Sequence, residues 1–181
     1  MIDQTITEYT QVIETCKDVF SKKTKDYGTA WRILRLPSIT DQIFIKAQRI
    51  RSIQEKGEQK IEDDIKSEFI GIINYCIIAM IQMELDKESR TEIPYEELEP
   101  HYDSAVNETR SLLQSKNHDY DEAWRDMRVS SITDIILMKL FRVKQIEDNQ
   151  GKTIISEGVR ANYQDMINYA VFALIKLTFS Q

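Results

Sequence analysis

The chain has 181 residues and a formal net charge of -6, with 41% hydrophobic and 30% charged residues. Five glycines and three prolines are too few for the many tight turns of a β-sandwich or barrel, so the composition favours long helices with few connections. The acidic balance argues against general binding along a nucleic-acid backbone, and we expect no duplex nucleic acid among the partners.

The two cysteines and the first residues indicate the compartment. Cys16 and Cys76 lie within apolar patterns, which predicts reduced thiols in a core rather than a disulfide framework. The N-terminal segment lacks the basic and apolar regions of a signal peptide. The longest apolar stretch, residues 69–81, is interrupted by Asn74 and is too short for a bilayer. We therefore expect a cytoplasmic protein without a membrane partner.

An internal repeat dominates the sequence. The 31 residues that begin at Lys23 align with those that begin at Lys116, an offset of 93, and 15 of the aligned positions are identical. After a slip of one residue, the match resumes near the end of each copy, where Asn74 aligns with Asn168. Upstream, over residues 1–22 and 94–115, Tyr9 and Tyr102 are the only identical pair.

Apolar residues recur every three or four positions along each copy, which predicts three helices per repeat. The first helix carries Tyr9, Ile13 and Cys16 on one face. The second is predicted to open with capping boxes at Ser38–Asp41 and Ser131–Asp134, and Gly57 is predicted to end it in the first repeat. The third follows the pattern of residues 61–83 in the first repeat and 159–179 in the second.

No segment alternates at a period of two, so the sequence predicts an all-α fold. Amphipathic helices must bury one face against each other, which predicts a helical bundle of two pseudo-symmetric three-helix repeats. We place the first repeat at residues 1–88 and the second at 95–181, with a linker over 86–97.

Repeated charges are the first candidates for a functional site. Lys46 and Arg49 lie three residues apart on one face of the second helix, and Lys139 and Arg142 repeat them. Such a cationic pair suits phosphate binding. The equally weighted alternative is a pair whose aliphatic stems cover the core while the charged ends bridge to carboxylates of the next helix.

Carboxylates on the third helix are the second candidates. Glu68 lies on the edge of an apolar stripe, where a carboxylate is unfavourable unless it is paired or metal-bound. The second repeat has Asp165 on its stripe. Two carboxylates on one helix face are able to hold Mg²⁺ together with waters and substrate phosphates, although charge balance with nearby lysines and arginines explains them as well. The metal candidates are Asp63, Asp64, Glu68, Glu157 and Asp165.

The segment that joins the first and second helices reads KDYG in one repeat and HDYD in the other. An aromatic ring beside an aspartate is able to hold a nucleotide base or sugar, and packing at a corner is the structural alternative. This makes nucleotide-binding candidates of Asp26, Tyr27, Asp119 and Tyr120. For the two tryptophans, Trp31 and Trp124, we favour the structural role.

These motifs resemble a known family. A K-x-x-D-Y-G-x-A-W segment, a K-x-x-R helix about twenty residues later and a closing acidic helix are similar to DUF1599, the nucleotide modification associated domain 1 family. The resemblance covers residues 23–83 and 116–177. It implies kinship with the all-α nucleoside triphosphate pyrophosphatases, namely the MazG-like enzymes and the dimeric dUTPases.

What the resemblance implies is cleavage of a (deoxy)nucleoside triphosphate between the α- and β-phosphates with Mg²⁺, or Mn²⁺ in its place. Glu68 and Asp165 would be the catalytic carboxylates, and phosphate would bind Lys46, Arg49, Lys139 and Arg142. Relatives of this kind are usually oligomeric, so a homo-oligomer is a further expectation.

The sequence also departs from the pyrophosphatase pattern. Those enzymes carry acidic pairs on two successive helices, whereas the second helix here has K-x-x-R. Relatives with the DYG turn have three acidic residues, spaced four apart, on the last helix. At those positions the first repeat has only Asp63, and the second has Glu157 and Asp165. Two alternatives therefore stand: a non-catalytic module that binds a nucleotide or a protein, and a structural pseudo-dimer whose repeated charges form salt bridges between helices.

Overall fold

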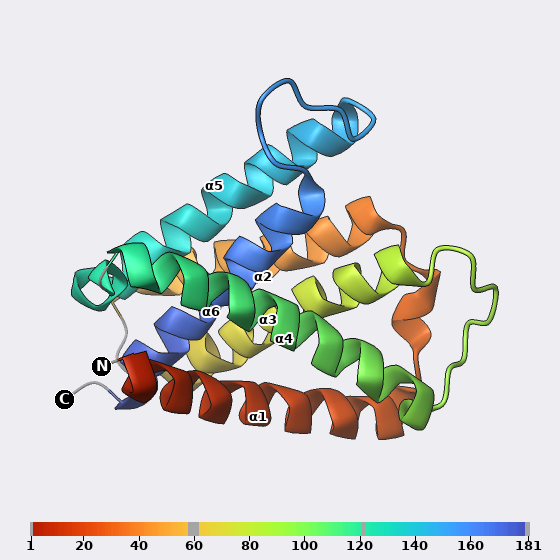
Figure 1. Ribbon diagram of the computed structural model, residues 1–181, viewed down its shortest axis with the longest axis horizontal. Coiled ribbons are helices and arrows are strands. Elements are labelled where there is room, and N and C mark those ends of the chain that lie inside the picture. The colour runs from red at the N-terminus through yellow and green to blue at the C-terminus, as the bar shows by residue number, and fades with distance from the viewer. Residues whose placement is uncertain (1, 58–61, 121, 180–181) are drawn as a thin grey trace.

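The computed structural model describes residues 2–57, 62–120 and 122–179, without the side chains of residues 2, 3, 62, 63 and 117–120. The regular elements in these ranges are all helical, which confirms the all-α class (Figure 1). No helix among them combines the length and the hydrophobicity needed to cross a membrane. In chain order the elements are α1 (Ile2–Tyr27), η1 (Ala30–Ile33), α2 (Leu36–Lys56), α3 (Glu62–Glu84), α4 (Tyr95–Tyr120), η3 (Ala123–Asp126), α5 (Val129–Asp148) and α6 (Val159–Phe179).

Four helices form the centre of the bundle. The helices α2, α3, α6 and α5 pack in a closed ring, while α1 and α4 lie against α3 and α6 (Figure 1). The predicted apolar stripes face this interior, where isoleucine is the commonest residue. Cys16 and Cys76 are buried and free, which confirms reduced core thiols, and burial raises the pKa of Cys16 to about 12. Apolar burial on this scale is the main stabilising contribution to such a fold.

The helix α2 begins earlier than the sequence analysis predicted. It starts at Leu36 with Arg35 as its N-cap residue, and Pro37 lies in the first turn, where a fixed φ and a missing N–H suit a helix start. Ser38 therefore lies inside the helix, and the capping-box prediction is wrong. The helix α5 repeats this start at Val129. The other end agrees with expectation, because Gly57 adopts a left-handed conformation with φ of 66° after the last turn.

The aspartates of the supposed capping boxes pair across the bundle instead. The Asp41 carboxylate lies 3.2 Å from Lys144 Nζ, and Asp134 lies 3.5 Å from an Arg51 guanidinium nitrogen. Both pairs join α2 to α5. At the repeat offset of 93, Asp134 corresponds to Asp41 and Lys144 corresponds to Arg51. The second pair is therefore equivalent to the first, with the roles of the two helices exchanged. The two repeats are thus related by a pseudo-twofold axis that passes between α2 and α5.

Two buried tyrosines tie the outer helices to the centre by the same symmetry. Tyr9 on α1 donates a hydrogen bond to Asn168 Oδ1 on α6 at 2.8 Å, and Tyr102 on α4 donates to Asn74 Oδ1 on α3 at 2.8 Å. Each amide in turn donates to a main-chain carbonyl on an outer helix. Each tyrosine therefore bonds to the third helix of the other repeat, and α1 packs more closely on α6 than on α3.

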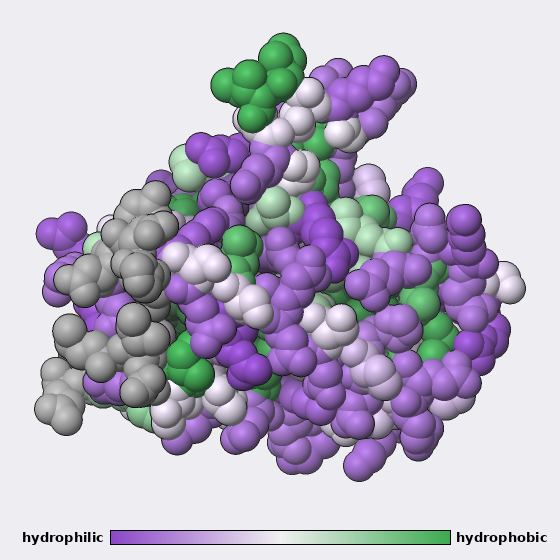
Figure 2. Space-filling view, viewed as in Figure 1, coloured by the Kyte–Doolittle hydropathy of each residue, from purple (hydrophilic) through white to green (hydrophobic). Residues whose placement is uncertain are grey.

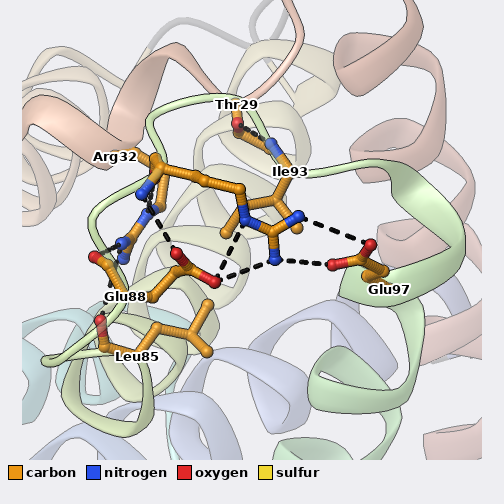
Figure 3. A network of polar contacts seen from close by, with 7 residues as sticks. Thr29, Arg32, Leu85, Glu88, Ile93 and Glu97 are labelled. Carbon is orange, nitrogen blue, oxygen red and sulfur yellow. Dashed lines mark hydrogen bonds and ion pairs between the residues drawn. The ribbon is translucent and has the colours of Figure 1, made fainter.

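The connection between the repeats, residues 85–94, is fastened to the end of α1 and to η1 (Figure 3). Arg32 donates to the main-chain oxygens of Glu88 at 2.7 Å and Arg90 at 3.2 Å. Thr29 Oγ1 donates to the Thr91 carbonyl at 2.6 Å and accepts from the Ile93 N–H at 3.0 Å. These bonds satisfy main-chain groups that no helix satisfies, so the connection has a defined path.

Candidate functional site

In the second repeat, Asp165 is held between two lysines from neighbouring helices. The carboxylate lies on α6 and faces α5, where Lys139 Nζ donates to its Oδ2 at 2.8 Å. Lys116, near the end of α4, donates to Oδ1 at 3.1 Å. The side chains of Lys139 and Asp165 are only 15% and 13% exposed. The two ammonium groups offset the loss of hydration that this carboxylate suffers at the edge of the core.

The first repeat has an equivalent ion pair with a different acid. Glu68 on α3 accepts from Arg49 Nη1 at 2.6 Å and lies 3.4 Å from Lys46 Nζ, both on α2. Its side chain is 11% exposed. Both cations that the sequence analysis assigned to phosphate are thus occupied by an internal carboxylate, as in the salt-bridge alternative.

The carboxylate has moved by one helical turn between the repeats. In the repeat alignment Glu68 corresponds to Asn162, and Gly71 corresponds to Asp165. A Cβ atom at Gly71 would lie 2.8 Å from the Cδ and Cε atoms of Lys46. Because Gly71 has no side chain, Lys46 extends across it and reaches Glu68.

A cavity of about 790 Å³ opens beside the ion pair of the second repeat. It lies between α5, the α5–α6 loop (residues 149–158) and the first turns of α6, and its size is in the range of small-molecule sites. Its lining unites four residues that the sequence analysis singled out: Lys139, Arg142, Glu157 and Asp165. The basic pair and the acidic stripe of this repeat therefore share one cavity.

The cavity differs from the first repeat in having cations that are not neutralised. Among the residues that the structure describes, Arg142 and Lys152 form no hydrogen bond or ion pair through their side chains, and both are exposed. Arg49, the counterpart of Arg142, is bound to Glu68. Three cationic side chains, including Lys139, face two carboxylates in the lining. An anion is therefore favoured here although the chain as a whole is acidic.

The remaining predicted site residues lie elsewhere. Asp26 and Tyr27 are at the exposed end of α1, with Tyr27 71% exposed, and neither lines this cavity. Asp64 on α3 is exposed and contacts no charged group in the described ranges. The side chains of Asp63, Asp119 and Tyr120 lie outside the described residues.

The tryptophan of the second repeat is a packing residue. Trp124 is 6% exposed and stacks on Phe172 of α6, with ring centroids 4.2 Å apart and planes within 4°. The Arg125 guanidinium lies 4.5 Å from the indole ring and pairs with Glu8 of α1 at 2.8 Å. The repeated Trp–Arg dipeptide thus fastens η3 to the bundle, in agreement with the structural interpretation.

The two carboxylates of the cavity are too few to hold a magnesium ion by themselves. They fit an ion that is also bound to the phosphates of a ligand. Glu157 and Asp165 supply the one or two carboxylates that Mg²⁺ usually takes beside waters and phosphates. Both oxygens of Asp165 already accept from lysines, so a metal ion there would have to displace an ammonium group. Within the described ranges, no three histidine, cysteine or acidic side chains gather as a metal site.

The α5–α6 loop contributes residues that the sequence analysis missed. Lys152, Ile154 and Ile155 all line the cavity. They lie between Gly151 and Gly158, outside every helical pattern, and helix periodicity therefore gave them no role. Two adjacent isoleucines in a short polar segment bounded by glycines are the signal that could have found them.

Comparison with known proteins returned a single kind of match. No curated protein and no solved structure matches the chain. The model of one family, described as nucleotide modification associated domain 1, matches residues 23–83 and again residues 116–177. The two matches contain both ion pairs, and the second contains the entire cavity lining. Together they cover most of the sequence, and the chain belongs to the nucleotide modification associated domain 1 family as a tandem repeat of its domain.

Proposed function

We propose that the protein binds a nucleoside phosphate in the cavity of the second repeat. The observation that carries this proposal is the contrast between Arg142, which has no charged partner in the described ranges, and Arg49, which Glu68 neutralises. A guanidinium is well suited to a phosphate group because it donates two parallel hydrogen bonds to two oxygens. The family description associates the domain with nucleotides, which supports this class of ligand.

The ion pair beside Arg142 has a positioning role in this proposal. Asp165 holds Lys139 from α5 and Lys116 from α4, so both ammonium groups are ordered before a ligand arrives. Lys152 adds a cation from the loop. A polyphosphate entering the cavity would accept hydrogen bonds from Arg142 first and share Lys139 with Asp165.

A magnesium ion accompanying the phosphates would be held by Glu157 and, where it displaces one of the two lysines, by Asp165. Its chemistry there would be to neutralise phosphate charge and to polarise a bound water. The protein's own contribution is the two carboxylates and three cationic side chains that line the same cavity. Magnesium is therefore expected to strengthen binding of the phosphates rather than to bind tightly by itself.

Paired variants of the two repeats test the binding proposal. Nucleotide affinity is measured by calorimetry for a panel of deoxynucleoside triphosphates with Mg²⁺. We expect Arg142→Gln to weaken binding by roughly tenfold or more, the effect of losing a charge-assisted hydrogen bond. Arg49→Gln is the matched control. It should leave affinity unchanged while lowering the melting temperature, because the partly buried Glu68 loses its closest cation.

Two results would overturn the proposal. One is the absence of any binding to the wild-type chain. The other is an equal loss of affinity in the Arg142 and Arg49 variants, because the second repeat would then have no special role.

Hydrolysis of the phosphoanhydride is a second candidate function, favoured by Glu157 and Asp165 lining the same cavity. The kinship with all-α pyrophosphatases that the motifs imply belongs to this candidate. The assay incubates each triphosphate with Mg²⁺ or Mn²⁺ and detects pyrophosphate and monophosphate. Turnover that Glu157→Gln reduces would support hydrolysis. Binding without turnover would reject it and leave a nucleotide-binding module.

A further inference from the structure

The α5–α6 loop holds two hydrophobic side chains in solvent at the rim of the cavity. Ile154 is 100% exposed and Ile155 is 94% exposed. The loop projects from the bundle at the top of Figure 1, and Figure 2 shows a strongly hydrophobic knob on that projection. Most of the other exposed surface in this view is hydrophilic. Exposing two adjacent isoleucines is unfavourable, which singles out this rim from the rest of the loop.

Hydrogen bonds within the loop define its shape. Thr153 Oγ1 donates to the Ser156 carbonyl at 2.6 Å, and this bond brackets the two isoleucines. Asn149 Nδ2 donates to the Lys152 carbonyl at 3.1 Å, and Gly151 takes a φ of 79°, which favours glycine. The isoleucine pair is therefore presented by a turn with its own bonds.

The two isoleucines lie at the loop end of the cavity, beside Lys152 and Glu157, and away from the ion pair that the helices carry. Lys139 and Asp165 form its inner end, and α5 then runs through Arg142 and Gln145 to Asn149, where the loop begins. Ten residues separate Lys139 from Asn149, about 15 Å along the helix axis. The charged pair is thus separated along the helix from the loop that carries the isoleucines. Between these ends lie the amides of Gln145 and Asn149.

We infer that Ile154 and Ile155 form the contact surface for the base of the bound nucleotide. This inference rests on the proposed function, because it takes the phosphates to be at the Lys139–Arg142 end. A nucleotide has the same sequence of chemistry as the cavity, with an anionic end, a polar sugar and a flat base whose faces are weakly hydrated. The base would cover the isoleucine side chains and remove apolar surface from water.

This surface limits how a base is distinguished. Aliphatic side chains donate and accept no hydrogen bonds, so the pair recognises the area of the ring and not its edge. A purine covers more of the surface than a pyrimidine does. The inferred site therefore favours purine over pyrimidine nucleotides and does not separate adenine from guanine.

The test compares a ligand that has a base with one that has none. Calorimetry with Mg²⁺ measures the affinities of inorganic tripolyphosphate, dATP and dCTP for the wild-type chain and for the double variant Ile154→Ser/Ile155→Ser. Ile33→Ser is the matched control, since Ile33 is 80% exposed and does not line the cavity. The fully exposed positions should leave the melting temperature without ligand unchanged.

The expected result is a loss of roughly tenfold in dATP affinity for the double variant, from the apolar area that is no longer covered. The loss for dCTP should be smaller, and tripolyphosphate affinity should not change. Unchanged dATP affinity, or equal losses for dATP and tripolyphosphate, would overturn the inferred base contact. Neither result would contradict the proposed binding of phosphate by the wild-type chain. If wild-type protein binds neither tripolyphosphate nor dATP, the proposed function fails and the inference fails with it.

Discussion

Individual hydrogen bonds between buried side chains join the two repeats. Tyr9 and Tyr102 are fully buried, and each donates to an asparagine on the closing helix of the other repeat. Desolvation raises the pKa of both phenols, so the hydroxyls stay protonated donors at neutral pH. These bonds explain why this tyrosine pair is the only identity between residues 1–22 and residues 94–115.

Removing one such hydroxyl should destabilise the fold. Tyr9→Phe leaves Asn168 Oδ1 buried without its donor, which is expected to lower the free energy of unfolding by about 1–3 kcal/mol. Thermal denaturation monitored by circular dichroism would record the change. By pseudo-symmetry Tyr102→Phe should have a similar effect. Tyr27→Phe, at a 71% exposed position, is the neutral control, and an equal effect there would contradict this account.

At this scale the sequence predicted the types of residue better than their partners. Pairing of Lys46 and Lys139 with carboxylates of the next helix was one of two equally weighted predictions from their places on the apolar stripe. That Arg49 is neutralised and Arg142 is not depends on whether the acid is at Glu68 or one turn later at Asp165. Moving the acidic residue by one helical turn leaves it on the same face of the helix. The apolar periodicity of the sequence therefore did not reveal the difference.

Among the elements, the connection over residues 85–94 is held by a second guanidinium, that of Arg90, besides Arg32 (Figure 3). The Arg90 side chain donates to Glu88 Oε1 at 2.8 Å and to Glu97 Oε2 at 2.7 Å, and it thereby links the connection to the first turn of α4. Hydrogen bonds from the side chain and the main chain of Arg90 lower the pKa of Glu88 to about 2. The carboxylate form of Glu88 is therefore the form that holds this connection.

Titration provides the test of this arrangement. A carboxyl group with a lowered pKa in the folded state stabilises the fold above its ordinary pKa, and the contribution is lost as pH falls towards about 2. Arg90→Gln should return the pKa of Glu88 to the ordinary carboxyl range in an NMR titration. Arg51→Gln, which removes an arginine from a different exposed ion pair, should leave that pKa unchanged. A Glu88 pKa that is the same in all three proteins would contradict the assignment.

Helix ends were harder to predict than helices. The apolar periodicity of residues 39–53 identified α2 correctly, but the start was assigned to Ser38 because a serine three residues before an acid resembles a capping box. Pro37 and the interaction of Asp41 with Lys144 give those residues other roles. The partner of Asp41 lies more than a hundred residues away, and local sequence rules do not contain it.

The whole molecule is a pseudo-dimer within one chain. The most extensive contact between helices joins α3 of the first repeat to α6 of the second, and each outer helix is bonded across the repeats. Each repeat taken alone would expose the apolar face that this contact covers. We therefore expect the folded state to be stable only when both repeats are present.

Separating the repeats tests this dependence. Residues 1–88 and 95–181, produced as two polypeptides, should each lack a cooperative melting transition as a monomer, because their α3 or α6 face is left in water. Mixing them in equal amounts should restore helix content and cooperative melting. Circular dichroism combined with sedimentation gives both readouts. A monomeric half that melts cooperatively would contradict the prediction.

Gly71 has a consequence for how the two halves have diverged. With Lys46 lying across it, changing Gly71 to aspartate alone would push that lysine aside and place a second negative charge beside Glu68. Changing Glu68 to asparagine alone would strand Lys46 and Arg49 without an acid. Each single step back towards the arrangement of the second repeat is unfavourable, although both together would reproduce it. The first half is thus held in its present state by epistasis, as a mutational ratchet.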